Sequence, residues 1–253
     1  MKILTLNTWQ ERGPWQVRWG VILEGLKHLR PEIAGFQEVF NHDWAQDIKR
    51  KSKFGYLVFH PEPSGLMLLS QFPVLHSECL TFRTQSPTED YLRYALYAEL
   101  EIRKKKSIAV FNTHLSWKLD EGSVREGQVE ELIEFIQLKA RGKDALVMGD
   151  FNATSDSSEV RRVQEQAGLT DTFAQMYPHD PGLTWNHINP YARNAGHPMP
   201  DRRIDYIFYS REFHVLPELK SADIVFNHPN DSGIWASDHF GLLAAFGEGD
   251  GSN

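Results

Sequence analysis

The feature that most constrains the fold of this chain is the way its apolar runs end. Short apolar runs alternate with stretches of helical periodicity, a pattern typical of mixed α/β proteins. Acidic, amide or imidazole side chains stand at the ends of most runs: Asn7, Glu38, His114, Asp150, Asn152, Asp205, Asp238 and His239. Because α/β sheets bind ligands beyond their strand ends, this pattern predicts one polar site at the edge of the sheets.

The apolar runs predict strands over residues 2–6, 32–37, 65–70, 94–102, 107–115, 145–148, 203–209 and 240–246. Helices are predicted over 15–30, 124–139 and 157–167, because apolar residues recur there at helical spacing. We expect Val17 and Ile22 to share the buried face of the first helix, and Ser157 or Ser158 to cap the third. The segment 178–203, rich in Pro, Gly, Asn and His, is predicted to be one long loop.

The chain of 253 residues has no internal repeat and no linker-like stretch, which favours a single domain over residues 1–247. Residues 248–253 are expected to form a disordered tail. The single cysteine, Cys79, excludes an intramolecular disulfide. No stretch approaches the length of a membrane span, and the first residues lack a signal-peptide pattern. We therefore expect a cytoplasmic monomer, or a secreted protein if a signal peptide has been removed.

The residue types at the strand ends point to metal-assisted chemistry on a phosphate ester. Carboxylate and amide oxygens are the ligands that Mg²⁺ and Mn²⁺ prefer, and histidines beside carboxylates transfer protons near neutral pH. Cysteine-rich zinc spacing, a P-loop and a G-x-S-x-G motif are absent from the sequence. The net charge of −7 argues against duplex DNA as the main partner, because binding DNA phosphates requires Lys and Arg.

Each of these residues also has a plain structural explanation. Asn7 could end a strand in an Asx turn, and Glu38 could be a surface residue. Asp238 could cap a turn, and His114 could be a buried histidine with satisfied hydrogen bonds. Taken singly, these explanations are at least as good as the functional ones. Together these explanations are less convincing, because so many strands end in carboxylate, amide or imidazole side chains.

Six motifs resemble those of the endonuclease/exonuclease/phosphatase superfamily, in the same order. They are LNTW, FQEV, NTHL, GDFN, RIDYIF and SDHF, and they extend from Asn7 to His239. That superfamily includes deoxyribonuclease I, apurinic endonucleases, neutral sphingomyelinases, inositol polyphosphate 5-phosphatases and deadenylases. The resemblance implies a four-layer α/β sandwich, in which two mixed, mainly antiparallel β-sheets pack face to face and helices cover the outer faces.

The resemblance also implies a metal and a phosphate site. Glu38 should be the principal ligand of Mg²⁺ or Mn²⁺, with Asn7 and Asp238 close by. Asp150 and Asn152 should bind the phosphate and position or activate the attacking water. The attack would be in line at phosphorus, with one metal or two.

Two histidines complete the set that the resemblance implies. His239, oriented by Asp205, should act as a base or contact the phosphate. His114 should donate to a phosphate oxygen or protonate the leaving group.

The long loop holds the candidate substrate contacts. LNTW and residues 184–209 are most similar to the neutral sphingomyelinase-like branch, and a related loop occurs in the tyrosyl-DNA phosphodiesterase branch. By this likeness Arg202 or Arg203 contacts the substrate phosphate, although either could be structural. Trp185 and Asn189 could contact a base, a sugar or a lipid headgroup, or pack the loop onto the body.

Three functional hypotheses remain. The first is an Mg²⁺-dependent phosphodiesterase that acts on a small or lipid-linked phosphodiester. The second is a nuclease or a sugar-phosphate phosphatase of the same superfamily. The third, a binding protein without catalysis, ranks lowest because no expected catalytic position is substituted.

Overall fold

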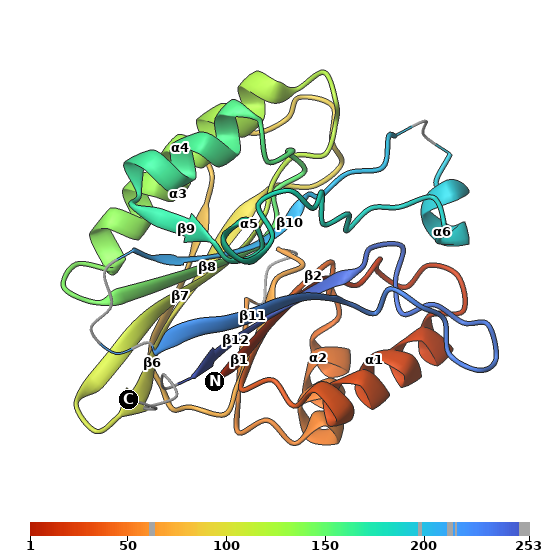
Figure 1. Ribbon diagram of the computed structural model, residues 1–253, viewed down its shortest axis with the longest axis horizontal. Helices are drawn as coiled ribbons and strands as arrows, with labels where there is room; N and C mark the ends of the chain where they lie inside the picture. Colours follow the sequence, from red (N-terminus) through yellow and green to blue (C-terminus); the bar gives the residue numbers. More distant parts are fainter. Residues whose placement is uncertain (61–63, 197–198, 212–214, 216, 248–253) are drawn as a thin grey trace.

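The computed structural model describes residues 1–60, 64–196, 199–211, 215 and 217–247. Two six-stranded sheets lie face to face, and helices cover their outer faces (Figure 1), so the predicted four-layer α/β sandwich is confirmed. The predicted tail, 248–253, lies outside the described residues, so the division into domain and tail stays a prediction. In the described part of the chain, no helix is both long and apolar enough to span a membrane.

The first sheet, sheet A, has the strand order β11-β12-β1-β2-β4-β3. Its strands are β1 (Lys2–Asn7), β2 (Ile33–Gln37), β3 (Tyr56–Phe59), β4 (Met67–Ser70), β11 (Glu218–Val225) and β12 (Gly241–Gly247). All neighbouring pairs are antiparallel except β1 and β2, which are parallel. The helices α1 (Trp15–Leu29) and α2 (His42–Ser52) pack against its outer face (Figure 1).

The second sheet, sheet B, has the strand order β5-β6-β7-β8-β10-β9. Its strands are β5 (Val74–Thr81), β6 (Tyr94–Arg103), β7 (Lys106–His114), β8 (Asp144–Asp150), β9 (Leu169–Asp171) and β10 (Asp205–Ser210). Only β7 and β8 are parallel. The helices α3 (Gly122–Lys139) and α4 (Ser158–Gln166) cover its outer face, and α5 (Thr172–Met176) and α6 (Pro190–Arg193) are short.

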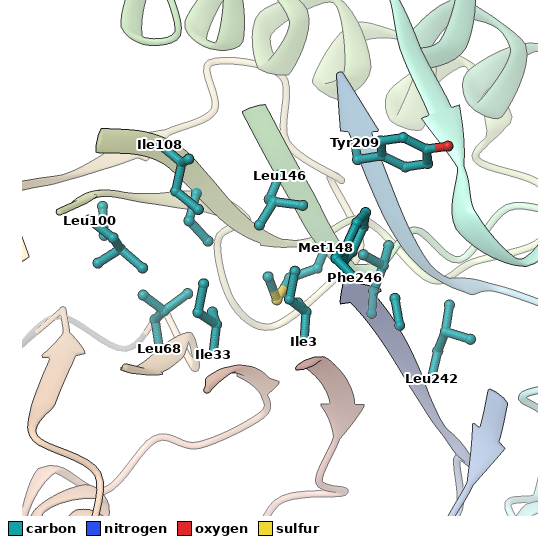
Figure 2. Packing of buried hydrophobic residues seen from close by; sticks show 14 of the residues in the cluster. Ile3, Ile33, Leu68, Leu100, Ile108, Leu146, Met148, Tyr209, Leu242 and Phe246 are labelled. Atoms are coloured by element: carbon teal, nitrogen blue, oxygen red, sulfur yellow. The ribbon is translucent and has the colours of Figure 1, made fainter. Parts of the chain in front are cut away.

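The space between the sheets is filled with apolar side chains from both. Leu100, Ile108 and Leu146 of sheet B face Ile3, Ile33 and Leu68 of sheet A (Figure 2). Burial of such side chains contributes about 1.5–3 kcal/mol each, so this layer holds the sheets at a defined separation.

The predicted first helix forms, but its buried face differs from the prediction. Val17 is 52% exposed, whereas Arg18, Trp19, Ile22 and Leu26 are buried. The expectation that Val17 faces the core is therefore wrong, because the bulky Trp19 sets the face that packs on sheet A. The cap of the third predicted helix is confirmed as Ser157, whose Oγ accepts the N–H of Val160.

Candidate active site

The register of sheet B sets three polar residues in one row. His114 is paired with Asp150 across the parallel strands β7 and β8, and Asp150 is paired with Asp205 across β8 and β10. Directly paired residues point to the same face of a sheet, so all three side chains leave the strand ends together. In sheet A, Asn7 is paired with Gln37 at the ends of β1 and β2, and Glu38 follows directly.

Asn7 links the two sheets at this edge. Its Nδ2 donates to Asp150 Oδ2 at 3.0 Å and lies 3.4 Å from Glu38 Oε1. Its Oδ1 accepts the backbone N–H of Trp9 at 3.0 Å, which fixes the orientation of the amide. The carboxylates of Glu38 and Asp150 are therefore placed on either side of one fixed amide, although they come from different sheets.

A histidine between two carboxylates lies beside this link. His239 Nδ1 lies 2.9 Å from Asp205 Oδ2, and His239 Nε2 lies 3.8 Å from Asp150 Oδ2. Each of the three residues offers one ligand atom within 4.8 Å of the others. The ring of Trp185 packs edge-on against His239, with centroids 5.0 Å apart, so the imidazole is held from two directions.

In the GDFN segment at the end of β8, Gly149 and Asn152 have positive φ angles, which few residue types adopt. Gly149 has φ +142°, and a Cβ at this position would lie 2.0 Å from the carbonyl oxygen of Thr113. Asn152 has φ +50°, its N–H donates to Asp150 Oδ1 at 2.9 Å, and its Nδ2 donates to the carbonyl of Leu115. The turn thus brings β8 very close to β7 and fixes the Asp150 carboxylate.

Burial raises the pKa values of three site carboxyls. Desolvation, followed by the charge of Asp205, raises the pKa of Asp150 to about 6. Desolvation also raises the pKa of Asp238 to about 6 and that of the partly buried Glu38. Ionised carboxylates in such surroundings are stabilised by a nearby cation.

The two histidines have opposite shifts. Burial disfavours the charge of His239, but the carboxylates of Asp205 and Asp150 outweigh it and raise the pKa of His239 to about 10. Burial, together with the positive charges of Arg93 and His239, lowers the pKa of His114 well below its usual value. His114 Nε2 lies 3.3 Å from Asp150 Oδ2. At neutral pH the site therefore holds a charged His239 and a neutral His114.

The donor set fits a hard divalent cation. The side chains offer several carboxylate oxygens, and Asp205 Oδ1 is buried without a hydrogen-bond partner among the described residues. Glu38 also lines a cavity of about 570 Å³, together with Phe40, which precedes α2, and Asp43 in its first turn. The group of three residues within 4.8 Å is Asp150, Asp205 and His239, whereas Glu38 adjoins it through Asn7.

The four candidate substrate residues from the long loop differ in their surroundings. Arg203 is buried and pairs with Asp171 at 2.5 Å, which favours the structural role for this arginine. Asn189 is fully buried, and its Nδ2 donates to the carbonyls of Ser237 and Asp238. Its amide therefore positions the segment that carries Asp238.

Arg202 and Trp185 lie closer to the reactive groups. Arg202 is buried, its Nη2 donates to Met199 Sδ at 3.2 Å, and its Nε has no hydrogen-bond partner among the described residues. Its backbone is bridged to that of Trp185, which in turn is bridged to that of His239. Arg202 thus remains available for a substrate contact, whereas Trp185 packs the loop onto the body.

Sequence reasoning missed two buried arginines beside the site. Arg18 of α1 donates to five backbone carbonyls: those of Thr8, Trp9, Gln10, Arg12 and Ala236. These bonds stabilise the loop after β1, where Trp9 and Gln10 have positive φ. Arg93, the second, precedes β6. A single sequence gives no signal for either, because arginine is mostly exposed and buried ion pairs become visible only in the fold.

A model of the endonuclease/exonuclease/phosphatase family matches residues 5–239, which include every residue of this cluster. The chain belongs to this family. The endonuclease/exonuclease/phosphatase family comprises metal-dependent phosphoric ester hydrolases. The resemblance seen in the sequence motifs is thereby confirmed.

Individual members of the endonuclease/exonuclease/phosphatase family are only distantly similar. The chain is 26% identical to the uncharacterized protein F14F9.5 of Caenorhabditis elegans over 194 residues, 62% of this chain and 57% of that protein. It is 25% identical to a sphingomyelinase of Mycobacterium tuberculosis over 190 residues, 74% of this chain and 37% of that protein. The chain thus spans less than two thirds of the length of these relatives.

Among solved structures of the same fold is D. rerio TDP2 complexed with a single-strand DNA product. The two chains share 19% of their residues, superpose with a TM-score of 0.78, and each is covered to 98%. At this identity the likeness shows the common fold alone.

Proposed function

We propose that this protein is an Mg²⁺-dependent phosphodiesterase that acts on a small or lipid-linked phosphodiester. The observation that carries the proposal is the cluster in which Asn7 joins Glu38 of one sheet to Asp150 of the other, beside the Asp205–His239 pair. Glu38, Asn7 and Asp238 would hold Mg²⁺, or alternatively Mn²⁺. The metal would neutralise charge on the phosphate.

The protonation states suggest how the side chains divide the work. Asp150, with a pKa of about 6, is mostly ionised at neutral pH and can accept a proton from the attacking water. The charged His239 is suited to contact a phosphate oxygen, which is one of the two roles that the family resemblance implies for it. The neutral His114 can donate a hydrogen bond to a second oxygen or to the leaving group. Asn152 holds the Asp150 carboxylate through its backbone N–H.

Hydrolysis of a panel of phosphoesters with Mg²⁺ or Mn²⁺ tests the proposal. We expect Glu38→Gln and His239→Ala each to lower kcat/KM by roughly 10²–10⁴-fold, because the first removes a negative charge that would hold the metal and the second removes a positive charge beside the phosphate. Glu24→Gln, an exposed glutamate of α1, is the matched control and should leave the rate unchanged. Wild-type protein that hydrolyses no phosphoester in the panel would refute the proposal.

A nuclease of the same family is the second candidate, because D. rerio TDP2, which has the same fold, was solved with a DNA product. Plasmid nicking measured beside sphingomyelin and sugar-phosphate hydrolysis separates the candidates. Cleavage of DNA that falls steeply with added salt would favour the nuclease. The net charge of −7 is our reason for preferring the first candidate. A monomeric state and a cytoplasmic location stay predictions.

A further inference from the structure

Arg93 is a buried cation beside the site to which the proposed mechanism gives no role. Its side chain is 1% exposed, yet neither Nη1 nor Nη2 has a hydrogen-bond partner among the residues that the structure describes. A buried guanidinium with two unused donors costs free energy, because these donors have lost their contact with water. An acceptor that binds both donors would remove that cost.

The guanidinium is held in place by its neighbours. Its Nε donates to Glu89 Oε2 at 2.6 Å, and Glu89 Oε1 accepts the backbone N–H of Trp117 at 2.8 Å. The ring of Tyr91 lies against the guanidinium, 4.5 Å from its central carbon. These contacts use Nε and one side of the group. They leave the edge formed by Nη1 and Nη2, which can bind two oxygens of one anion as a fork.

The strand register places Arg93 at the edge of the candidate active site. Its neighbour Tyr94 is paired with His114, and His114 is paired with Asp150, so Arg93 directly precedes the strand next to the one that ends in His114. Electrostatics agree with this placement. Burial lowers the pKa of His114, and the charge of Arg93 is the next largest cause.

The Glu38 side of the site is equally close. Burial raises the pKa of Glu38, while the charges of His239 and Arg93 oppose that rise. Tyr91, which contacts the guanidinium, packs edge-on against Phe40 with centroids 5.4 Å apart. Phe40 and Glu38 both line the 570 Å³ cavity. Arg93 therefore adjoins the His114 part of the site through the strand pairing and the Glu38 part through Tyr91 and Phe40.

We propose that Arg93 binds the substrate phosphate, with Nη1 and Nη2 donating to two of its non-bridging oxygens. Glu89 is then a positioning residue that orients the fork through Nε. The inference rests on the proposed function, since both concern the same site, and it adds the residue that recognises the anionic group. An ion pair with Glu89 alone accounts for Nε but leaves both Nη donors unexplained.

Binding of inorganic phosphate, followed by ³¹P NMR line broadening, tests this inference without requiring hydrolysis. We expect Arg93→Gln to weaken binding about 10- to 100-fold, since a charged pair of hydrogen bonds is lost. Arg93→Lys should weaken it less, because an ammonium keeps the charge but not the fork. Arg83→Gln is the matched control: Arg83 belongs to the same segment and pairs with Glu131, but its side chain is 79% exposed. It should bind phosphate within twofold of wild type.

The Arg93→Lys variant also covers the case in which Arg93→Gln does not fold. Lysine keeps a positive charge beside Glu89, so this variant decides the question if Arg93→Gln does not fold. Folded Arg93 variants that bind phosphate as tightly as wild type would overturn the inference.

Kinetics with bis(p-nitrophenyl) phosphate provide a second measurement. We expect Arg93→Ala to lose at least about tenfold in kcat/KM and to regain activity with added methylguanidinium, which a merely structural role would not produce. Phosphate binding through Arg93 without any hydrolysis would contradict the proposed function and support this inference. Normal hydrolysis by the Arg93 variants would overturn this inference and leave the proposed function intact.

Discussion

The two site histidines both face Oδ2 of Asp150, at 3.3 Å and 3.8 Å, but their surroundings favour opposite charges. His239 lies between two carboxylates, whereas His114 is buried near the cations Arg93 and His239. Electrostatics at the scale of single residues therefore turns two identical side chains into a cation and a neutral donor. A site with both can contact two phosphate oxygens in different ways.

Metal affinity should depend on pH through the buried carboxyls. Because desolvation raises the pKa of Asp238 to about 6, this group is mostly protonated at pH 5 and mostly ionised at pH 7. A cation must displace the proton at the lower pH, so we expect Mg²⁺ to bind about tenfold more tightly at pH 7 than at pH 5 for each such carboxyl. Calorimetry at both pH values measures this. Equal affinities would show that these carboxyls do not hold the metal.

Cys79 should be an inert thiol in the folded protein. Desolvation raises the pKa of this thiol to about 12, so at pH 8 almost none of it is thiolate. We expect its reaction with Ellman's reagent to be roughly a thousandfold slower than that of the same protein unfolded in urea, where the pKa is near 8.5. Equal rates before and after unfolding would contradict this expectation.

At the scale of elements, the turn after β8 is where the backbone is most tightly constrained. Gly149 brings β8 so close to β7 that the space for a side chain is filled by the carbonyl of Thr113. Asp150 and Asn152 lie one and three residues after Gly149, so this turn fixes where their side chains lie. The motif GDFN thus combines a packing requirement with a chemical one.

Gly149→Ala should be strongly destabilising. Its φ of +142° disfavours any Cβ, and the new methyl would lie 2.0 Å from a backbone oxygen, so we expect a loss of about 3 kcal/mol or more in the free energy of unfolding. Gly20→Ala, in α1 with open space around the new atom, is the control and should gain about 0.5–1 kcal/mol. Urea denaturation measures the free energy of unfolding of both variants. A Gly149→Ala variant as stable as Gly20→Ala would contradict this expectation.

Elements with long apolar runs were predictable, while those with few buried residues were not. β8 is buried throughout, and its apolar run stands out in the sequence. The sequence analysis named no helix at α2, in which only Ala45 and Ile48 are buried, and no strand at the half-exposed β11. Most strand-end residues were predicted from their chemistry. Arg93 was not, because its partner Glu89 and its place beside His114 depend on how β6 and β7 pair.

On the scale of the whole molecule, the candidate site lies where sheet A and sheet B meet. Each sheet has one parallel pair, β1–β2 with α1 between them in sequence, and β7–β8 with α3 between them (Figure 1). The carboxyl ends of both pairs carry site residues, Asn7 and Glu38 on one side and His114 and Asp150 on the other. The packing of the sheets on each other therefore creates the site.

A cation bound between residues of sheet A and sheet B should stabilise the whole fold. At a Mg²⁺ concentration of 100 times Kd, binding to the native state alone adds about 2.7 kcal/mol, so we expect a higher Tm with Mg²⁺ and its reversal by EDTA. Glu38→Gln should lose most of this increase, while Glu24→Gln should keep it. An equal rise in Tm for both variants would place the cation elsewhere.

The order of the strands along the chain also limits when the candidate active site can form. Sheet B comes entirely from residues 74–210, whereas β11 and β12 of sheet A follow later, and β12 pairs with β1 at the very start. During synthesis, sheet A stays incomplete until β12 leaves the ribosome, and Asp238 and His239 directly precede that strand. A nascent chain therefore carries no assembled candidate site, and the proposed hydrolysis can begin only after translation has passed β12.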